Sequence, residues 1–217
     1  YEHELTLGFQ GVCPHDPALR AFCDVAGECA IPLEEPMRFL GAMRSDLTIR
    51  RYATYEDLRS YMRGSAAAVG VMMCSVLGAS QNEIAVHAAK SLGEAMQLTN
   101  FLRDVGEDAS RGRIYLPEED LTAFGVSEQD VLDGRITPGF TDLMKFQIDR
   151  ARSLYRSAEK GVALLPKNSR KAVRLAAILY SRILSRIEAG GYDVFQSRAR
   201  TSKAEKMTVA ARVLAGF

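Results

Sequence analysis

The sequence predicts a single all-α domain spanning residues 1–217. Apolar residues recur at helical spacing along almost the whole chain, and no segment alternates apolar and polar residues as a strand would. There is no internal repeat and no Ser/Gly-rich linker. A chain of this length can bury a full core, so one domain is the simplest organisation.

The first two predicted helices follow prolines, whose missing N–H has no intrahelical partner at a helix start. Pro17 opens one helix, which ends before Pro32. Pro36 opens the next, and apolar residues follow it on one face: Leu40, Met43 and Leu47.

Polar side chains then predict two long helices, because they can accept hydrogen bonds from the free N–H groups of a first turn. Thr54 and Asp57 have the spacing of a capping box and open a helix to about Leu77. Asn82 caps the next helix, which runs to about Ala109.

Breakers and caps divide the remaining residues into shorter and longer helices. Gly112 ends the preceding helix, and a short helical connection follows Pro117. The further predicted segments are a start at Ser127, a long helix from Thr137-Pro138 towards Leu165, one from about Ser169 to Ala189, and a last one from Ser202.

Composition excludes several classes of protein. The net charge of +1 does not favour binding to nucleic acid. The four cysteines make no CxxC pair, so reduced thiols in a cytoplasmic protein are expected rather than a zinc site. The apolar run 66–79 is too short to cross a bilayer and is expected to be a buried core helix.

A polar stripe lies in the middle of this apolar sequence. At about 100° per residue, Gln97, Asn100, Asp104 and Asp108 fall within an arc of roughly 80° on one helix face. Hard oxygen ligands one turn apart suit Mg²⁺, or Mn²⁺ in its place, together with substrate phosphates. A solvated helix face is the alternative for two aspartates alone, but basic residues suited to phosphate follow them at Arg111-Gly112-Arg113.

The stretch from Asn100 to Pro117, NFLRDVGEDASRGRIYLP, resembles the second aspartate-rich motif of the squalene and phytoene synthase family. Other segments resemble the same family: 46–58, 61–70, 180–184 and 191–198. The resemblance runs from about Leu19 to Lys206, with the bacterial phytoene synthase branch as the better match.

This resemblance implies an all-helical bundle of the class I isoprenoid synthase type around a central cavity, of which residues 1–217 would be roughly the C-terminal two-thirds. It implies a Mg²⁺-dependent prenyltransferase of carotenoid biosynthesis. That enzyme would condense two geranylgeranyl diphosphates head to head, through a cyclopropylcarbinyl diphosphate, to 15-cis-phytoene. Squalene or dehydrosqualene synthesis from farnesyl diphosphate remains an alternative, as does a non-catalytic assembly protein or a binding protein for prenyl diphosphates.

The resemblance also implies roles for individual residues. Asp104, Asp108 and Asn100 would bind the metal and take part in catalysis, with Gln97 orienting phosphate or metal-bound water. The remaining candidates are Arg113, Tyr115, Arg51 and Arg198 for binding the diphosphate, and Tyr52 and Tyr180 for catalysis. Core tyrosines and a surface arginine are the alternatives for Tyr52, Tyr180 and Arg198. Arg103 is on another helix face and is expected to brace the structure.

Two departures from the family pattern matter. Arg63 stands where relatives in the squalene branch often have a tyrosine, and only Tyr61 is close by. The first aspartate-rich motif has no match, because the acids of Asp24-Val-Ala-Gly-Glu28 fall in the wrong place. With one carboxylate bank missing, the 217-residue chain alone is expected to be impaired.

Small residues and substrate chemistry give two further expectations. The runs Gly64–Ala68 and Ala88-Ala89 fit tight helix packing, a tunnel for an isoprenoid tail, or both. Because such substrates are amphiphiles, a cytoplasmic protein in peripheral contact with the membrane is expected.

Overall fold

The structure, a computed structural model, describes residues 1–79, 82–196 and 198–215. Within these ranges the chain is helical and contains no strand, which confirms the predicted fold class. In chain order the elements are α1 (Glu2–Phe9), α2 (Pro17–Glu28), α3 (Glu34–Ser45), α4 (Tyr55–Met62), the π-helical turn η1 (Arg63–Ala67), α5 (Ala68–Val76), α6 (Glu83–Arg103), α7 (Val105–Ser110), α8 (Glu118–Ala123), α9 (Glu128–Leu132), α10 (Pro138–Val162), α11 (Lys167–Ala189) and α12 (Lys203–Ala215).

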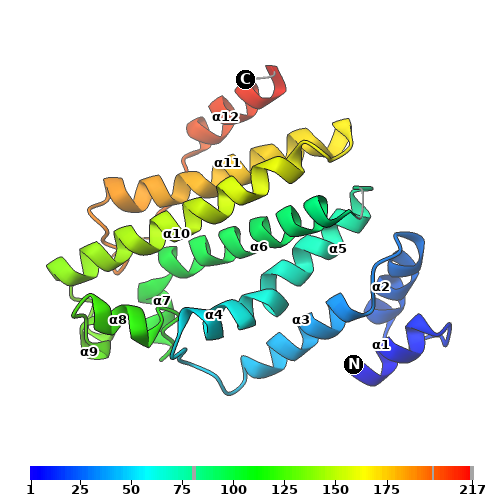
Figure 1. Ribbon diagram of the computed structural model, residues 1–217, viewed down its shortest axis with the longest axis horizontal. Coiled ribbons are helices and arrows are strands. Elements are labelled where there is room, and N and C mark those ends of the chain that lie inside the picture. Colours follow the sequence, from blue (N-terminus) through cyan, green and yellow to red (C-terminus); the bar gives the residue numbers. More distant parts are fainter. Residues whose placement is uncertain (80–81, 197, 216–217) are drawn as a thin grey trace.

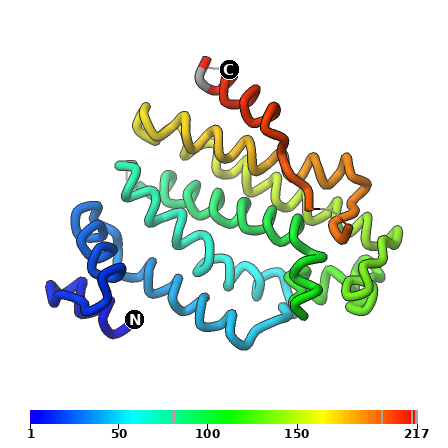
Figure 2. Tube along the Cα trace, turned by 180° about the vertical axis from the view of Figure 1, so that it is seen from behind, coloured from blue at the N-terminus to red at the C-terminus, as the bar shows by residue number. Residues whose placement is uncertain are grey.

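Helix α6 lies in the middle of the bundle (Figure 1). It packs against α10 and α11 on one side and against α5 and η1 on the other. Helix α3 covers η1 and α5, and α12 covers α11. Figure 2 shows the same order from behind, with α1 and α2 beside one end of α3.

The core forms where α6 meets α10 and α11. Leu98 and Leu102 of α6, Leu143 and Ile148 of α10, and Leu184 of α11 are at most 1% exposed. Burying one such side chain contributes about 1.5–3 kcal/mol. This apolar contact holds the C-terminal half of α6, which carries the polar stripe, in a fixed position.

The predicted caps are confirmed at four helix starts, and Ser202 caps the start of α12 in the same way. Thr54 Oγ1 accepts a hydrogen bond from the Asp57 N–H at 3.1 Å, and Asn82 Oδ1 accepts one from the Ala85 N–H at 2.8 Å. The other two starts have the same contact: Ser127 Oγ to the Asp130 N–H at 3.1 Å and Thr137 Oγ1 to the Phe140 N–H at 3.0 Å. Local side-chain chemistry therefore sets where these helices begin.

The prediction of one regular helix from Thr54 to about Leu77 is wrong in its middle. Residues 63–67 form the π-helical turn η1, which separates α4 from α5. At this turn α3 approaches closely, since a Cβ on Gly64 would lie 2.6 Å from the Arg38 carbonyl oxygen. A π turn inserts one extra residue and so lets the helix change direction against its neighbour.

The predicted helix from Asn82 to about Ala109 also divides. Helix α6 ends at Arg103, Asp104 has φ −104° and ψ 13°, and α7 begins at Val105. The Asp108 N–H still donates to the Asp104 carbonyl at 2.8 Å, so the two helices continue closely from one another. Gly106 of α7 packs on the 194–195 backbone, where a Cβ would lie 2.9 Å from Val194 O.

The N-terminal region departs from the prediction in three ways. Helix α1, which no pattern predicted, buries Leu5 to 1% exposure. Helix α3 begins at Glu34 with Pro36 as its third residue, where the missing N–H is still one of the four without a partner. Leu47 lies beyond the end of α3 and is 75% exposed, so it does not share the buried face.

Helix α5 buries one face in the core and exposes the other, whereas the whole helix was expected to be buried. Val71 and Cys74 are buried as predicted, but the opposite face carries Val69, Met73 and Val76 at 37–45% exposure. Within the described ranges, the structure contains no helix with the length and hydropathy needed to cross a membrane.

Candidate active site

The end of α6, the bend at Asp104 and α7 form one wall of a polar cavity of about 360 Å³. The structure brings Gln97, Asn100, Asp104 and Asp108 together here, although the helix that should carry them is divided. The bend falls at the third of these residues, Asp104, and all four still line the cavity. The other residues lining this polar cavity are Met43, Asp46, Tyr61, Ser65, Phe101, Arg103 and Tyr115.

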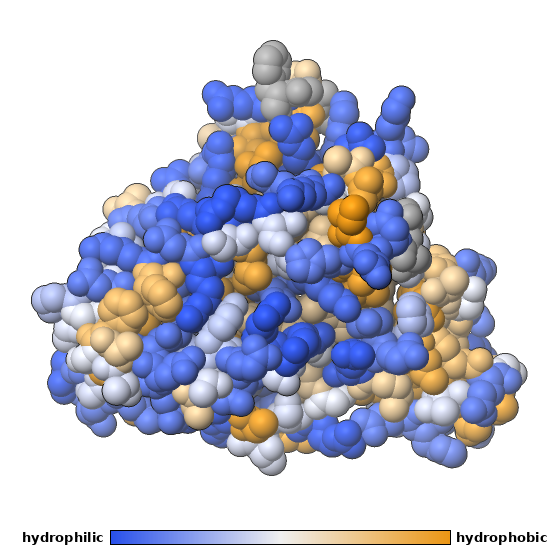
Figure 3. All heavy atoms as spheres, viewed as in Figure 1, coloured by the Kyte–Doolittle hydropathy of each residue, from blue (hydrophilic) through white to orange (hydrophobic). Residues whose placement is uncertain are grey.

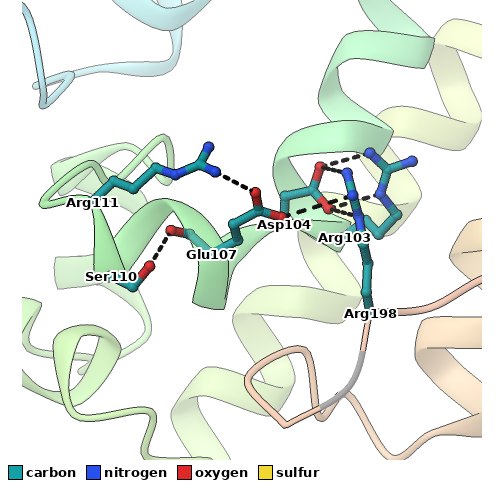
Figure 4. Close-up of polar contacts among 6 residues, drawn as sticks. All are labelled: Arg103, Asp104, Glu107, Ser110, Arg111 and Arg198. Carbon is teal, nitrogen blue, oxygen red and sulfur yellow. Dashed lines mark hydrogen bonds and ion pairs between the residues drawn. The ribbon is translucent and has the colours of Figure 1, made fainter.

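Two arginines hold the Asp104 carboxylate from different parts of the chain (Figure 4). Arg103 donates to it at 2.8 and 2.6 Å, and Arg198 donates to it at 2.7 Å through both Nε and Nη2. Burial alone would raise the pKa of Asp104, but the hydrogen bonds and charges of Arg103 and Arg198 outweigh it and lower the pKa. Asp104 is therefore ionised and fixed in orientation.

The surroundings of Asp108 shift its pKa in the opposite direction. Its pKa is raised to about 6, first by burial and then by the negative charges of Asp104 and Glu107. Arg111 and Arg113 lower it only in part, and the Arg111 guanidinium pairs with Glu107 at 2.7 Å. A half-buried carboxyl with this balance of charges would gain from a cation placed beside it.

The donor set of the polar cavity fits a divalent cation. Asn100 Oδ1 and Ser65 Oγ are buried, with no hydrogen-bond partner among the residues that the structure describes. Carboxylate and amide oxygens at Asp104, Asp108 and Asn100 are the ligand type that Mg²⁺ takes. No cluster of three or more His, Cys, Asp or Glu able to hold a metal occurs in the described part of the chain, so phosphate or water would have to complete the shell.

Tyr115 lines the polar cavity and contacts both Phe101 and Arg113. The Tyr115 ring stacks on Phe101 with centroids 4.0 Å apart. Arg113 donates to Tyr115 Oη at 3.1 Å and to the Asp46 carbonyl at 2.7 Å. Arg113 thus borders the cavity through Tyr115 without lining it.

Arg113 and Arg198 only contact residues that line the polar cavity, and three more predicted residues do not line it either. Arg51 pairs with Glu128, with Nε 2.9 Å from Oε1, and donates to the Gly112 carbonyl at 2.7 Å. Tyr52 is 4% exposed, its hydroxyl has no partner among the described residues, and its pKa is raised by burial. Tyr180 on α11 packs against the core and lies close enough to Arg103 to affect its pKa.

Sequence reasoning missed other residues of the polar cavity. Tyr61 donates to Asp46 Oδ2 at 3.1 Å, whereas Arg63 turns outward and pairs with Glu56 at 2.8 Å. Arg103, expected to brace the structure, lines the cavity. Asp46 and Tyr61 each open a segment that carries the family resemblance, so a signal existed, but their spacing alone could not show that they face Asp104.

An apolar tunnel of about 460 Å³ adjoins the polar cavity along α5 and α6. Ser65 and Gln97 line both spaces. The tunnel is lined mainly by small and aliphatic residues: Ala66, Val69, Gly70, Met73, Cys74, Leu77, Ala79, Ala85, Ala88, Ala89, Leu92, Gly93, Met96, Ala158, Gly161, Val162, Leu165, Val173 and Ala176. The same small residues also serve packing, because a Cβ on Gly93 would lie 2.5 Å from the Ala66 carbonyl oxygen.

Comparison with known proteins gives consistent matches. The family model described as squalene/phytoene synthase matches residues 2–205. The chain is 39% identical to a phytoene synthase of Arthrospira platensis over 95% of its own length and 71% of that protein. It is 40% identical to the chloroplastic phytoene synthase of Narcissus pseudonarcissus over 89% of its length, but spans only 47% of that relative.

A solved structure supports the same grouping at the level of the fold. A dehydrosqualene synthase in complex with a ligand superposes with a TM-score of 0.90 and 31% sequence identity. The match covers 99% of this chain and 75% of that one.

Proposed function

Because the chain belongs to the squalene/phytoene synthase family of prenyltransferases, we propose that it takes part in the Mg²⁺-dependent condensation of two geranylgeranyl diphosphates to 15-cis-phytoene. The identity of about 40% to phytoene synthases supports this substrate over a shorter one. The product would serve carotenoid biosynthesis.

The junction of the two cavities is the observation that carries the proposal. Ser65 and Gln97 belong both to the polar cavity with the aspartates and to the apolar tunnel. A ligand that fits this shape has an anionic head and a long apolar tail. Prenyl diphosphates have that shape, and their reacting C1–O bond would lie at the junction.

The polar residues would bind and orient the diphosphate. Asp104, Asp108 and Asn100 would hold Mg²⁺, which when bound neutralises charge on the departing diphosphate. Arg198, which contacts Asp104, and Arg113, which contacts Tyr115, would donate to phosphate oxygens. Gln97 would orient the head group where the tunnel begins.

The apolar residues would protect the carbocation. Cleavage of one C1–O bond releases diphosphate, and the second substrate's double bond attacks the allylic cation and loses a proton to give the cyclopropylcarbinyl diphosphate. Loss of its diphosphate, rearrangement and loss of another proton give the linear hydrocarbon, and no reductant is needed. Aliphatic side chains such as Leu92 and Met96 exclude the water that would quench the cations.

Two other functions remain as outcomes of the test. Squalene or dehydrosqualene synthesis from farnesyl diphosphate is favoured by the similarity to a dehydrosqualene synthase structure. A non-catalytic role as an assembly or binding protein would leave the paired carboxylates at Asp104 and Asp108 without a purpose. For the tails of either substrate, we further propose peripheral contact of a cytoplasmic protein with the membrane.

The test is conversion of geranylgeranyl diphosphate with Mg²⁺, followed by extraction and chromatography of the hydrocarbon. In the complete gene product, Asp104→Ala and Asp108→Ala should each reduce turnover by about 10²-fold or more, because each removes a carboxylate that would hold the Mg²⁺ needed to neutralise the diphosphate. The matched control is Asp142→Ala, which changes an exposed aspartate on α10. Phytoene formation that both active-site variants retain would contradict the proposal, and product from farnesyl diphosphate alone would favour the shorter substrate.

A further inference from the structure

Two turns meet near the N-terminal end of α6, the end opposite to Asp104. These are the turn after α5, at residues 77–79, and the turn between α10 and α11 (Figure 1). Ser169 Oγ at the start of α11 donates to the Leu77 carbonyl after α5 at 3.4 Å. Gly161 near the end of α10 packs on Ala88 of α6, where a Cβ would lie 2.1 Å from the alanine Cβ.

The apolar tunnel reaches the surface between these turns. Leu77, Ala79 and Val162 line it there and are only half-buried. The tunnel therefore has a polar end at Gln97 and Ser65 and an apolar end at the two turns.

Exposed apolar side chains surround the apolar end. Met73 and Val76 on α5, Ile84 at the start of α6 and Leu164 after α10 are 45%, 43%, 59% and 40% exposed. We call these four residues the tunnel rim. Figure 3 shows an apolar patch at this end of the molecule, at the upper right in the view, and further apolar patches elsewhere, one of them over α1 and α2 at the lower right. Apolar side chains grouped around a cavity mouth in this way indicate an interaction surface.

The same end has an excess of basic residues. Residues 76–90 and 159–174 contain six Lys or Arg and two acids, whereas the rest of the sequence contains 22 Lys or Arg and 25 acids. The exposed basic side chains of these two segments are Lys90, Lys160, Lys167, Lys171 and Arg174. Apolar side chains at the tips of turns, with basic groups behind them, complement the layered chemistry of an anionic bilayer.

We propose that the tunnel rim is the membrane-docking surface and that its partner is a bilayer containing anionic lipid. The rim enters the apolar boundary while Lys160 and Lys167 contact lipid phosphates, which places the tunnel mouth against the acyl chains. The purpose of this contact, passage of an isoprenoid tail between bilayer and tunnel, rests on the proposed function. The contact itself does not depend on turnover.

The experiment is co-sedimentation of the chain with phosphatidylcholine vesicles that contain or lack phosphatidylglycerol. Binding should require phosphatidylglycerol and weaken with salt. At about 1 kcal/mol for each basic residue near the surface, Lys160→Gln/Lys167→Gln should lower the partition coefficient about 30-fold. Ile84→Gln/Leu164→Gln should lower it about tenfold, because the inserted apolar area is lost.

Matched controls come from the opposite end of the molecule. Leu132 and Ile136 are 40% and 42% exposed, so Leu132→Gln/Ile136→Gln removes equally exposed apolar groups. Arg135→Gln/Lys145→Gln removes two exposed charges there. Both controls should bind as the parent does, and circular dichroism should show every variant folded.

Each other result overturns the proposal. These results are no binding to phosphatidylglycerol vesicles, equal binding to phosphatidylcholine alone, or an equal loss in rim and control variants. Failure of the enzymatic proposal remains distinguishable. A chain without product that still binds through the rim supports this surface, and an active protein that binds no vesicle rejects the surface alone.

Discussion

Two aspartates one helical turn apart differ sharply in this site. Asp104 has a lowered pKa because Arg103 and Arg198 donate to both of its oxygens, while Asp108 has a raised pKa because it is buried beside other acids. The charge of Asp104 is thus already balanced by two arginines of the protein. Asp108 has no such partner in the part of the chain that the structure describes, and it would gain more from a bound cation.

The raised pKa of Asp108 predicts how stability depends on pH. The pKa moves from 3.8 to about 6 in the folded chain, so ionisation opposes folding. The penalty is fully present above pH 6 and disappears as the pH falls through the window from about 6 towards 3.8. Without metal, Asp108→Asn should therefore raise the free energy of unfolding by about 1–2 kcal/mol at pH 7, allowing for solvent screening, and by almost nothing near pH 4.

Urea unfolding in chelator at several pH values measures this effect. Asp142→Asn, on an exposed aspartate, should change stability little at any pH. Equal stability of Asp108→Asn and the parent at pH 7 would show that the carboxyl is not held unfavourably. Saturating Mg²⁺ should reverse the order, because only the aspartate gains the cation.

Helical periodicity accounts for what could be predicted at the residue scale. It placed Gln97, Asn100 and Asp104 on one face, and the structure shows all three in the polar cavity. Asp46 lies just after α3 and Tyr61 lies on α4, and no local spacing encodes which helix faces which. The roles given to these side chains remain predictions.

At the scale of elements, helix starts were predictable and helix breaks were not. Thr54 and Asn82 cap through contacts within three residues, which a local pattern contains. The turn at η1 and the bend at Asp104 lie beside distant backbone, Arg38 near Gly64 and Val194 near Gly106. Interruptions of this kind depend on tertiary contacts that are not visible in the intervening sequence.

Close helix contact makes one glycine of α5 sensitive to substitution. A Cβ on Gly70 would lie 2.3 Å from the Ala89 carbonyl oxygen of α6, and backbone cannot move aside cheaply. We expect Gly70→Ala to lower the free energy of unfolding by about 1–3 kcal/mol. Gly41→Ala is the matched control in α3, because no atom lies within 4 Å of its Cβ, and it should stabilise by about 0.5–1 kcal/mol.

Thermal unfolding of these two variants separates packing from helix propensity. At about 2–4 °C for each kcal/mol, their melting temperatures should move in opposite directions. Stabilisation by both substitutions would mean that α5 and α6 are not in the close contact described.

At the scale of the whole molecule, the polar cavity offers one pair of carboxylates and a single further one, Asp46, whose oxygens contact Tyr61 and Arg113. Asp104 and Asp108 lie on the α6–α7 wall, and Asp24 and Glu28 of α2 are exposed and do not line it. We therefore predict that the 217-residue chain alone turns over geranylgeranyl diphosphate at least about tenfold more slowly than the complete gene product. Equal rates for the two proteins in the hydrocarbon assay would show that one bank of acids suffices.

The small residues along α6 divide the length of the tunnel into equal steps. Gln97, Gly93, Ala89 and Ala85 all line it at intervals of four residues, which is about 6 Å of helix rise. The isoprenoid tail of a substrate whose diphosphate lies beside Gln97 would pass Gly93, Ala89 and Ala85 in that order. A bulky side chain at one of these three positions would block the tunnel there, and each position nearer to Gln97 would shorten the accessible length by about one further helical turn. The three small side chains therefore set the length of hydrocarbon that fits.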